Sequence, residues 1–529
     1  MQIAIAHYHL NRGGVTQVIA NHLRALDVAV PDGERLRVLL LYGGRREGWP
    51  EDLPAECPRL DIQLAEVPEL EYDDGKVSDI EPLSLQFRIE DVLGRNGFEP
   101  EETLLHIHNH ALGKNTSVPV AAALLARKGV RLLLQVHDFA EDFRPDLYRK
   151  LVSLTAREGD TATLPELLYP QAPQIHYAVL NGRDRNVLAN AGVEESQLHW
   201  LPNPVAAFGE LPSQDEARTK LAERFGIASD VPLLLYPVRG IRRKNLGEML
   251  LCSAALGDAA SFAVTLTPMN PAERVSHDAW RTLAEKLGLS CYFGVGDADG
   301  LSFTENISAA DAIVTTSVAE GFGMVYLEAW LAGRPLVGRN LPEITDDFVA
   351  QGLRLDAMYD SLAVPLDWIG EQALRGSVAR IFEQVLGQYD RKSEMADRFE
   401  PFFDDLINDT TSPATVDFAT LDVPLQRAVI ESVHRDAERR EQLVQLNPKI
   451  GAMAAASVAD AARPIAHNRV VISEDYSLEV FGKRLYQLYQ KILSSEDVGR
   501  LNALPAGTSI LDTFLDVRRL RPVRTDADS

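Results

Sequence analysis

The chain has 529 residues, of which 46% are hydrophobic and 25% charged, and its formal net charge is −24. This composition is typical of soluble globular proteins, and the length predicts two large domains. An acidic surface should repel nucleic acid and anionic lipid. Only Cys57, Cys252 and Cys291 occur, which predicts no disulfide framework, and no apolar run is long enough to span a bilayer. We therefore expect a cytoplasmic protein with no stable membrane insertion and no nucleic-acid partner.

Short apolar runs alternate with helical patterns, which is typical of parallel sheets covered on both faces. The strands predicted in the first half are Gln2–Ala6, Leu36–Tyr42, Thr103–His108, Val130–Val136 and Ile175–Leu180. Those predicted in the second half are Pro232–Val238, Phe262–Thr267, Cys291–Phe293, Ala312–Thr315 and Leu336–Gly338. Two successive doubly wound α/β domains follow from this pattern. Two prolines near His199–Phe208 place the domain boundary near residue 206.

Residues that follow the strands are the first candidates for binding, because ligands of open parallel sheets sit beyond the carboxyl ends of the strands. Gly13 and Gly14 stand between the first strand and a helix, where free backbone N–H groups and the helix dipole favour an anion. A simple tight turn is the alternative. The pattern is not the Gly-x-Gly-x-x-Gly of dinucleotide-binding proteins, which weakens a dehydrogenase.

A cluster of cations follows the first strand of the second half. Arg239 and Lys244 lie in the stretch Arg-Gly-Ile-Arg-Arg-Lys, which forms a candidate anion clamp in an otherwise acidic protein. A solvated basic loop is the alternative.

The stretch Ser317–Glu328 contains two glutamates around a Gly-Phe-Gly. We expect Glu320 in a loop and Glu328 in the early turns of a helix over 324–332. Gly321 and Gly323 would let the backbone approach a ligand, and carboxylates accept hydrogen bonds from hydroxyls. Two carboxylates at different heights suggest a polyhydroxylated ligand, such as a sugar joined to a ribose. A loop glutamate and a helix-terminal glutamate without function are the alternative.

Together these motifs resemble the retaining glycosyltransferases of the GT-B fold, in particular the family 4, glycogen-synthase-like group. Further similar stretches are Leu105-His-Ile-His-Asn-His, Gln135-Val-His-Asp-Phe, Leu201-Pro-Asn-Pro-Val and Leu341-Pro-Glu-Ile. The resemblance covers residues 1 to about 345 and resumes near the C-terminus. It implies two Rossmann-like domains that face each other across a cleft.

The resemblance also implies roles for individual residues. The diphosphate of a nucleotide sugar would be held by Arg239, Lys244 and the backbone at Gly13 and Gly14, and His137 would lie near the reacting sugar. Glu328 would bind the ribose, while the donor sugar would be held by Glu320 with the backbone of Gly321, Phe322, Gly323 and Met324. The base would be read by backbone around residues 292–296. The reaction would be a front-face displacement that needs no metal and no cofactor.

The acceptor is expected in the N-terminal domain, and its candidate contacts are His110, Lys114 and Arg144. A surface role for the lysine is the alternative. We expect a small soluble acceptor that carries phosphate or carboxylate. His106, His108 and His110 alternate along one predicted strand face and could in principle ligate a metal, but we expect them to pack.

The chain departs from the family pattern after Pro342. We predict an N-terminal domain over 1–205, completed by a crossing helix over about 476–495. The C-terminal domain covers 206–475 with a helical insertion over about 345–470, and 496–529 is a tail. The insertion would cap the cleft, enlarge the domain or form the surface of a homo-oligomer.

The favoured function is hexose transfer from a nucleotide sugar to a hydroxyl. Alternatives are a related epimerase or phosphorylase, and a non-catalytic protein that binds a nucleotide sugar. A glycoside hydrolase is a minor reading, because its two carboxyls must face each other across the scissile bond.

Overall fold

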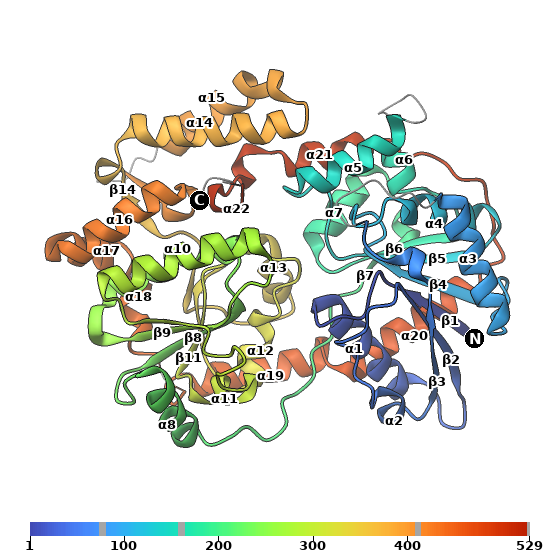
Figure 1. Ribbon diagram of the computed structural model, residues 1–529, viewed down its shortest axis with the longest axis horizontal. Coiled ribbons are helices and arrows are strands. Elements are labelled where there is room, and N and C mark those ends of the chain that lie inside the picture. Colours follow the sequence, from blue (N-terminus) through green and yellow to red (C-terminus); the bar gives the residue numbers. More distant parts are fainter. Residues whose placement is uncertain (74–80, 157–163, 408–413, 457, 526–529) are drawn as a thin grey trace. The chain divides into compact units, whose positions relative to one another are not determined.

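The computed structural model describes residues 1–73, 81–156, 164–407, 414–456 and 458–525. The chain divides into two compact units (Figure 1). Unit 1 contains Met1–Ala206 and Glu474–Leu515, and unit 2 contains Ala207–Ser473 and the chain from Asp516 onward. The segment expected as a tail is therefore shared, because residues 496–515 pack in unit 1 and residues from 516 pack in unit 2.

Unit 1 is built on a seven-stranded, all-parallel sheet with the order β3-β2-β1-β4-β5-β6-β7. The strands are β1 (Gln2–Ala6), β2 (Leu36–Tyr42), β3 (Leu60–Glu66), β4 (Thr103–His108), β5 (Arg131–Val136), β6 (Ile175–Val179) and β7 (Leu198–Trp200). The helices are α1 (Gly14–Ala29), α2 (Leu53–Glu56), α3 (Pro82–Arg95), α4 (Ser117–Arg127), α5 (Pro145–Ala156), α6 (Leu164–Leu168), α7 (Gly182–Ala191), α20 (Leu478–Ser494) and α21 (Thr508–Phe514).

Both faces of this sheet are buried, as the near-continuous apolar strands predict. Alternate side chains of β1 enter different cores. Ile3 and Ile5 pack with residues of α1 and α20, whereas Ala4 and Ala6 pack with residues of α3 and α4.

Helix α20 closes unit 1 from a distant part of the sequence. Its buried face repeats at helical spacing, and it packs against α1. Gly482 permits this close approach, because a Cβ there would lie 2.0 Å from the carbonyl oxygen of Ala25.

Unit 2 has a six-stranded parallel sheet with the order β10-β9-β8-β11-β12-β13. Its strands are β8 (Leu233–Arg239), β9 (Ser261–Leu266), β10 (Cys291–Phe293), β11 (Ala312–Thr315), β12 (Leu336–Arg339) and β13 (Met358–Tyr359). A separate antiparallel pair consists of β14 (Ala363–Pro365) and β15 (Thr415–Asp417).

Helices cover both faces of this sheet and form most of the segment over 345–470 (Figure 1). They are α8 (Gln214–Phe225), α9 (Leu246–Leu256), α10 (Pro271–Leu287), α11 (Phe303–Ala309), α12 (Val325–Leu331), α13 (Pro342–Ala350), α14 (Glu371–Gln388), α15 (Met395–Ile407), α16 (Val423–Arg435), α17 (Ala437–Leu446), α18 (Pro448–Met453), α19 (Ala462–Asp475) and α22 (Pro522–Thr525). The inserted segment also supplies β13, β14 and β15.

A buried ionic network joins the inserted segment to the sheet of unit 2. Arg339 Nη2 lies 2.7 Å from a carboxylate oxygen of Glu248 and 2.7 Å from one of Asp417. The Tyr359 hydroxyl donates to Glu248 Oε1 at 2.9 Å. Since Arg339 ends β12, Glu248 lies on α9 and Asp417 ends β15, these contacts fix three elements together.

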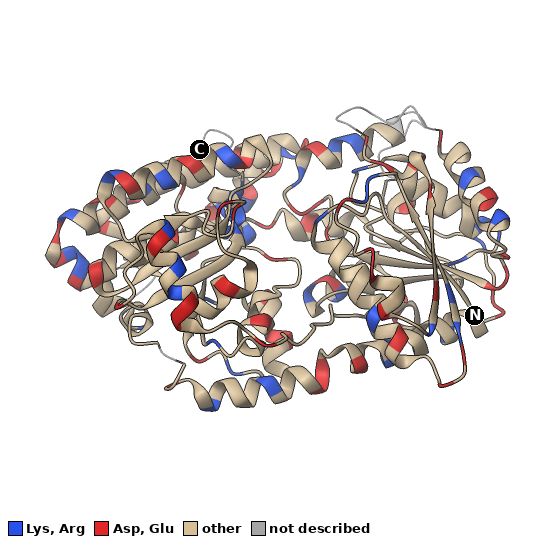
Figure 2. Ribbon diagram, turned by 60° about the horizontal axis from the view of Figure 1, so that its bottom comes forward, with Lys and Arg blue, Asp and Glu red and all other residues tan. Residues whose placement is uncertain are grey.

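Charged residues of both signs are interspersed along the outer helices of both units (Figure 2). Cys57, Cys252 and Cys291 are free thiols. Among the described residues, no helix is both long enough and apolar enough to cross a bilayer.

Candidate donor site

The loops that follow β8 and β11 meet at the point where the strand order of unit 2 reverses. Strands β9 and β10 lie on one side of β8, and strands β11, β12 and β13 lie on the other side. Ligands of doubly wound sheets bind at such switch points. The loop after β8 contains the short 3-10 helix η4 (Arg242–Lys244), and the loop after β11 carries Glu320.

Glu320 makes two ion pairs with the η4 turn. Lys244 Nζ donates to Oε1 of Glu320, and Arg243 Nη1 donates to Oε2 at 2.8 Å. The Glu320 side chain is 7% exposed and that of Lys244 is 11% exposed. The structure thus joins two of the predicted donor-site residues and adds Arg243, which the sequence analysis did not select.

All three groups of this cluster are charged at neutral pH. Burial disfavours the ionised Glu320 carboxylate, but the charges of Lys244 and Arg243 outweigh burial and lower its pKa to about 2. Burial lowers the pKa of Lys244 to about 8 against the attraction of Glu320. Two cations and one carboxylate leave the cluster with a net positive charge.

Backbone contacts hold the two loops together beneath this cluster. The Val318 N–H donates to the Arg243 carbonyl at 2.9 Å. Two hydroxyls donate to the Lys244 carbonyl, that of Tyr236 at 3.1 Å and that of Thr316 at 3.0 Å. The positions of Lys244 and Glu320 are therefore fixed before any ligand binds.

Arg239 ends β8 and is half-buried. The pairing of β8 with β9 is irregular between Tyr236 and Arg239, where Pro237 cannot donate a backbone hydrogen bond. The Arg239 guanidinium forms no hydrogen bond or ion pair with the described residues. It is thus a cation at the switch point that has no structural partner there.

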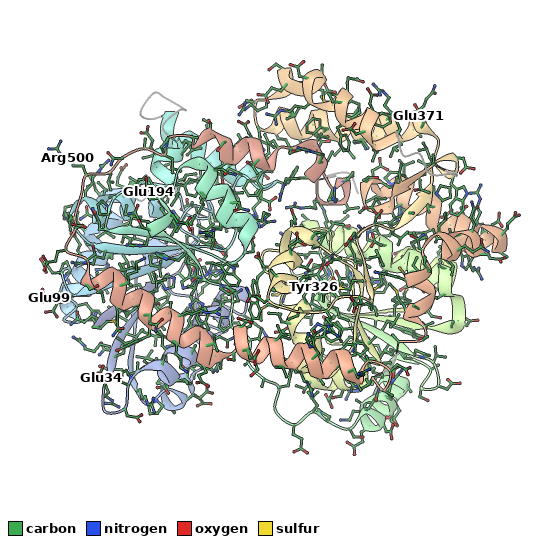
Figure 3. All side chains as sticks on the ribbon, turned by 180° about the vertical axis from the view of Figure 1, so that it is seen from behind. Glu34, Glu99, Glu194, Tyr326, Glu371 and Arg500 are labelled. Carbon is green, nitrogen blue, oxygen red and sulfur yellow. The ribbon has the colours of Figure 1, made fainter. Side chains whose placement is uncertain are left out.

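The Gly-Phe-Gly stretch leads from this cluster into α12. Gly323 has φ +83°, and a Cβ there would lie 2.7 Å from Tyr326 Cδ2, so the turn requires glycine. Tyr326 lies inside unit 2 (Figure 3). Phe322 is buried edge-on against Phe348, so its ring packs inside unit 2. Gly321 and Met324 on either side are half-buried.

Glu328 lies in the first turn of α12, as predicted. Its carboxyl forms no hydrogen bond or ion pair with the described residues, and burial raises its pKa to about 7. A half-buried carboxyl without a partner among the described residues is costly to the fold, which favours a role in binding.

In unit 1 the predicted glycines open α1. Gly13 and Gly14 are exposed, no side chain caps this helix, and a Cβ on Gly14 would meet nothing within 4 Å. Packing therefore does not explain these glycines, and the first backbone N–H groups of α1 are available to an anion.

His137 belongs to a buried group of histidines at the end of β5. Its Nε2 lies 2.8 Å from His108 Nδ1, and its N–H donates to the Asn109 side chain at 2.8 Å. Burial lowers the pKa of His137 to about 4, so the imidazole is neutral. It can offer a hydrogen bond to a sugar but no positive charge.

The expectation that three histidines share one strand face is wrong for His110. Strand β4 ends at His108, and Asn109 has φ +59°, which breaks the alternation. His110 is fully buried, and its Nε2 lies 2.7 Å from the Leu168 carbonyl oxygen. This placement argues against contact of His110 with an acceptor.

His22 takes the place of His110 beside the other two histidines. Ligand atoms of His22, His106 and His108 all lie within 4.8 Å of one another, in the one such group of three found among the described residues. However, both ring nitrogens of His106 already have partners, the Tyr489 hydroxyl at 2.8 Å and Gln135 at 2.9 Å. This arrangement favours packing over ligation.

The other two acceptor candidates lie close together in unit 1. Burial, Arg144 and Lys150 lower the pKa of Lys114, whose Nζ lies 5.2 Å from the ring centre of Tyr72. Arg144 is paired with Asp138 at 2.6 Å. A cavity of about 650 Å³ in unit 1 lies elsewhere, against His176 at the amino end of β6, where open parallel sheets do not bind ligands.

Known proteins support the assignment suggested by these motifs. No family model matches the chain. Mannosylglucosyl-3-phosphoglycerate synthase of Petrotoga mobilis is 24% identical over 536 residues, which cover 98% of this chain and 97% of the relative.

Two solved structures share the fold. Sucrose-phosphate synthase from Thermosynechococcus elongatus matches 93% of this chain and 99% of its own with a TM-score of 0.51 and 14% identity. HepE of Anabaena, in complex with UDP, matches 93% of this chain and 100% of its own with a TM-score of 0.50 and 12% identity. The chain therefore has the GT-B fold, and its motifs resemble those of the GT4-like glycosyltransferases.

Proposed function

We propose that the protein is a retaining glycosyltransferase that moves a hexose from a nucleotide diphosphate sugar to a hydroxyl of a small anionic acceptor. The observation that carries this proposal is the cationic cluster at the switch point of unit 2, where Lys244 and Arg243 hold Glu320 and the Arg239 guanidinium has no partner among the described residues. A doubly negative diphosphate complements the net charge of these four groups.

The donor is assigned to the loops of unit 2. Arg239, Lys244 and Arg243 meet the diphosphate. Glu328 accepts from the ribose hydroxyls. Glu320 retains lone pairs beyond its two ion pairs, so it also accepts from hydroxyls of the sugar. The base is assigned to backbone in the loop that begins after β10, at residues 294–296.

Departure of the leaving group places negative charge on a diphosphate oxygen. Fixed cations directed at that oxygen stabilise the transition state, because they need no reorganisation during the reaction. In a front-face displacement the departing oxygen takes the proton of the acceptor hydroxyl, and the new bond forms on the same face of the sugar. The cations supply the charge stabilisation, so the proposed reaction requires no metal ion and no cofactor.

The proposed acceptor is a sugar derivative that carries phosphate and carboxylate. The name of the relative that spans the whole chain describes synthesis of mannosylglucosyl-3-phosphoglycerate. Glucosyl-3-phosphoglycerate is therefore the first acceptor to test. Lys114 and Arg144 remain the predicted acceptor contacts in unit 1, and His137 is predicted to contact the transferred sugar. The free cysteines agree with the proposed cytoplasmic location.

A nucleotide panel followed by a transfer assay tests this function. We expect one of UDP, GDP and ADP to raise the melting temperature at millimolar concentration, because a ligand that binds only the folded state stabilises it. The hexose of the corresponding nucleotide sugar should then be transferred to glucosyl-3-phosphoglycerate with retention of configuration, also when a chelator is present. Failure of all three nucleotides to bind would overturn the donor assignment, and activity that depends on one divalent ion would overturn metal independence.

Glu328 predicts a pH dependence of nucleotide binding. The carboxylate accepts hydrogen bonds from two hydroxyls more strongly than the neutral acid does, and with a pKa of about 7 Glu328 is mostly neutral at pH 6 and mostly charged at pH 8. The ratio of wild-type to Glu328→Gln affinity for the nucleotide should therefore rise by up to about tenfold over this range, because the titration of Lys244, whose pKa is about 8, affects both proteins. Titration calorimetry of the wild type and of Glu328→Gln measures it. The variant should bind weakly at both pH values, and an unchanged pH slope in the variant would refute the assignment.

A further inference from the structure

The end of the described chain folds back onto the donor loops of unit 2. The 3-10 helix η9 (Val517–Arg519) and α22 follow Asp516, and α22 packs against η4, against α14 and against the 3-10 helix η8 (Phe418–Thr420). Figure 1 shows α22 below α14. Because η4 carries Arg243 and Lys244, the end of the chain lies beside the cations of the donor site.

A cavity of about 200 Å³ lies between this segment and the loops after β11 and β12. The loops contribute Val318 and residues 340–343, and Arg339 and Asp360 also line it. The C-terminal segment contributes Arg518, Arg519, Arg521 and Arg524. We call this cavity the arginine pocket. It shares the loop of Val318 and Glu320 with the donor site.

Several charges of the arginine pocket are neutralised within the protein. Glu248 and Asp417 compensate Arg339, Arg519 Nη1 lies 3.0 Å from Glu343, and Arg518 pairs with Asp516 at 2.5 Å. Asn340 donates to Asp360 at 2.8 Å. Arg339, Arg518 and Arg519 each have an acidic partner, so Arg521 is the arginine that we consider for binding an external anion.

Arg521 is half-buried and forms no ion pair with the described residues. Its Nη1 donates to the carbonyls of Arg518 and Leu520, both at 3.0 Å, which fixes the guanidinium but supplies no negative charge. Burial, Arg339 and Arg524 lower its pKa against the attraction of Asp417 and Glu343. An anion in the pocket would relieve this cost, and guanidinium groups bind phosphate and carboxylate bidentately.

We propose that the arginine pocket binds the phosphate or carboxylate group of the acceptor. The pocket is smaller than a typical cavity for a whole ligand, about 300–1,000 Å³, so it fits the charged end and leaves the sugar outside. The donor diphosphate has its own cations after β8. Lys114 and Arg144 are weaker candidates for this group, because one stacks on Tyr72 and the other is paired with Asp138.

The proposal rests on the proposed function for the identity of the ligand, but binding tests it without turnover. We expect 3-phosphoglycerate to bind the wild type both alone and with a saturating nucleotide, as measured by titration calorimetry. Arg521→Gln should weaken this binding by at least tenfold and leave nucleotide affinity within twofold. Arg524→Gln should act in the same direction, which guards against misfolding of one variant.

Two matched variants serve as controls. Lys114→Gln tests the alternative anion site, and Arg500→Gln removes an exposed arginine of unit 1 (Figure 3). Arg500→Gln should bind 3-phosphoglycerate as the wild type does, and Lys114→Gln should lose less affinity for it than Arg521→Gln. Loss of binding in Lys114→Gln instead of Arg521→Gln would overturn the proposal, as would competition between 3-phosphoglycerate and the nucleotide.

Kinetics separate an acceptor group from a free anionic effector. 3-Phosphoglycerate should inhibit transfer in competition with glucosyl-3-phosphoglycerate, and Arg521→Gln should raise the KM of that acceptor by at least tenfold. Activation or non-competitive inhibition would overturn the acceptor role. Arg521-dependent anion binding without any transfer would count against the proposed function alone, whereas transfer with an unchanged acceptor KM in Arg521→Gln would count against the pocket alone.

Discussion

Replacing Arg239 by glutamine is expected to reduce kcat/KM by about 10²–10³-fold, the usual effect of removing one group that stabilises developing negative charge. The melting temperature should stay within about 1 °C of the wild type, because the guanidinium has no hydrogen bond or ion pair with the described residues that the change would break. A substitution that lowers kcat/KM but leaves the melting temperature unchanged identifies a residue that acts on the ligand.

The matched control for this prediction is Arg274→Gln. Arg274 is an exposed arginine on α10 that forms no ion pair with the described residues, so the same change in charge and shape is made outside the cluster of Glu320, Lys244 and Arg243. Steady-state kinetics of both variants with the nucleotide sugar, together with thermal unfolding, make the comparison. Equal activity of the two variants would show that Arg239 does not contact the donor.

Most of the strands that the sequence revealed are buried on both faces, and β10, which is half-buried, is the exception. Each of the ten predicted runs overlaps a strand of the structure. Strand β3 was missed because Leu60–Glu66 alternates apolar with polar residues and lies at the edge of the sheet, half exposed. Strands β7, β13, β14 and β15 have two or three residues, which is too short for a periodic signal, and β10, also of three residues, was found only as an apolar run.

The candidate donor site could be predicted as far as strand ends determine it. Glycines and charges after β8 and β11 had to meet at the switch point, whichever residues lay between them. The choice among three successive cations could not be made, because whether Arg243 or Arg242 faces Glu320 depends on the turn of η4. Arg243 and Glu320 are 77 residues apart.

Residues brought in from the C-terminus had no signal of this kind. Arg521 lies in a short polar stretch that resembled a tail, and its neighbours in the pocket, among them Arg339 and Glu343, are defined only by tertiary packing. The predicted position of His110 was wrong for a local reason. The alternation of the strand was extended past His108, the last residue of β4, into the left-handed conformation of Asn109.

The other large effect is expected at Glu320. Glu320→Gln removes the counter-charge of Lys244 and Arg243, and breaking a buried ion pair from one side costs about 3–5 kcal/mol. The double variant Glu320→Gln/Lys244→Met should regain part of this loss, because it also removes the buried charge of Lys244 that Glu320 no longer neutralises. Coupling energies of contacting pairs are about 0.5–3 kcal/mol. Urea unfolding of the wild type, both single variants and the double variant measures the cycle.

Glu305→Gln is the matched control for stability. Glu305 also pairs with a lysine, Lys220, and its pKa is also lowered to about 2, first by the hydrogen bond from that lysine, but the lysine side chain is 48% exposed. Solvent-exposed pairs contribute less than about 1 kcal/mol. If Glu305→Gln lowered the free energy of unfolding as much as Glu320→Gln does, burial of the ion pair would not explain the effect at Glu320.

The pH dependence of the Glu320 effect has a defined sign. The folded-state pKa of about 2 lies below the ordinary value of 4.5, so the stabilisation is fully present above pH 4.5 and is lost as the pH falls toward 2. The difference in unfolding free energy between wild type and Glu320→Gln should therefore shrink below pH 4.5. Transfer activity should not return in the double variant, because both side chains are proposed to contact the donor; recovery of activity together with stability would reduce the Glu320–Lys244 pair to a structural role.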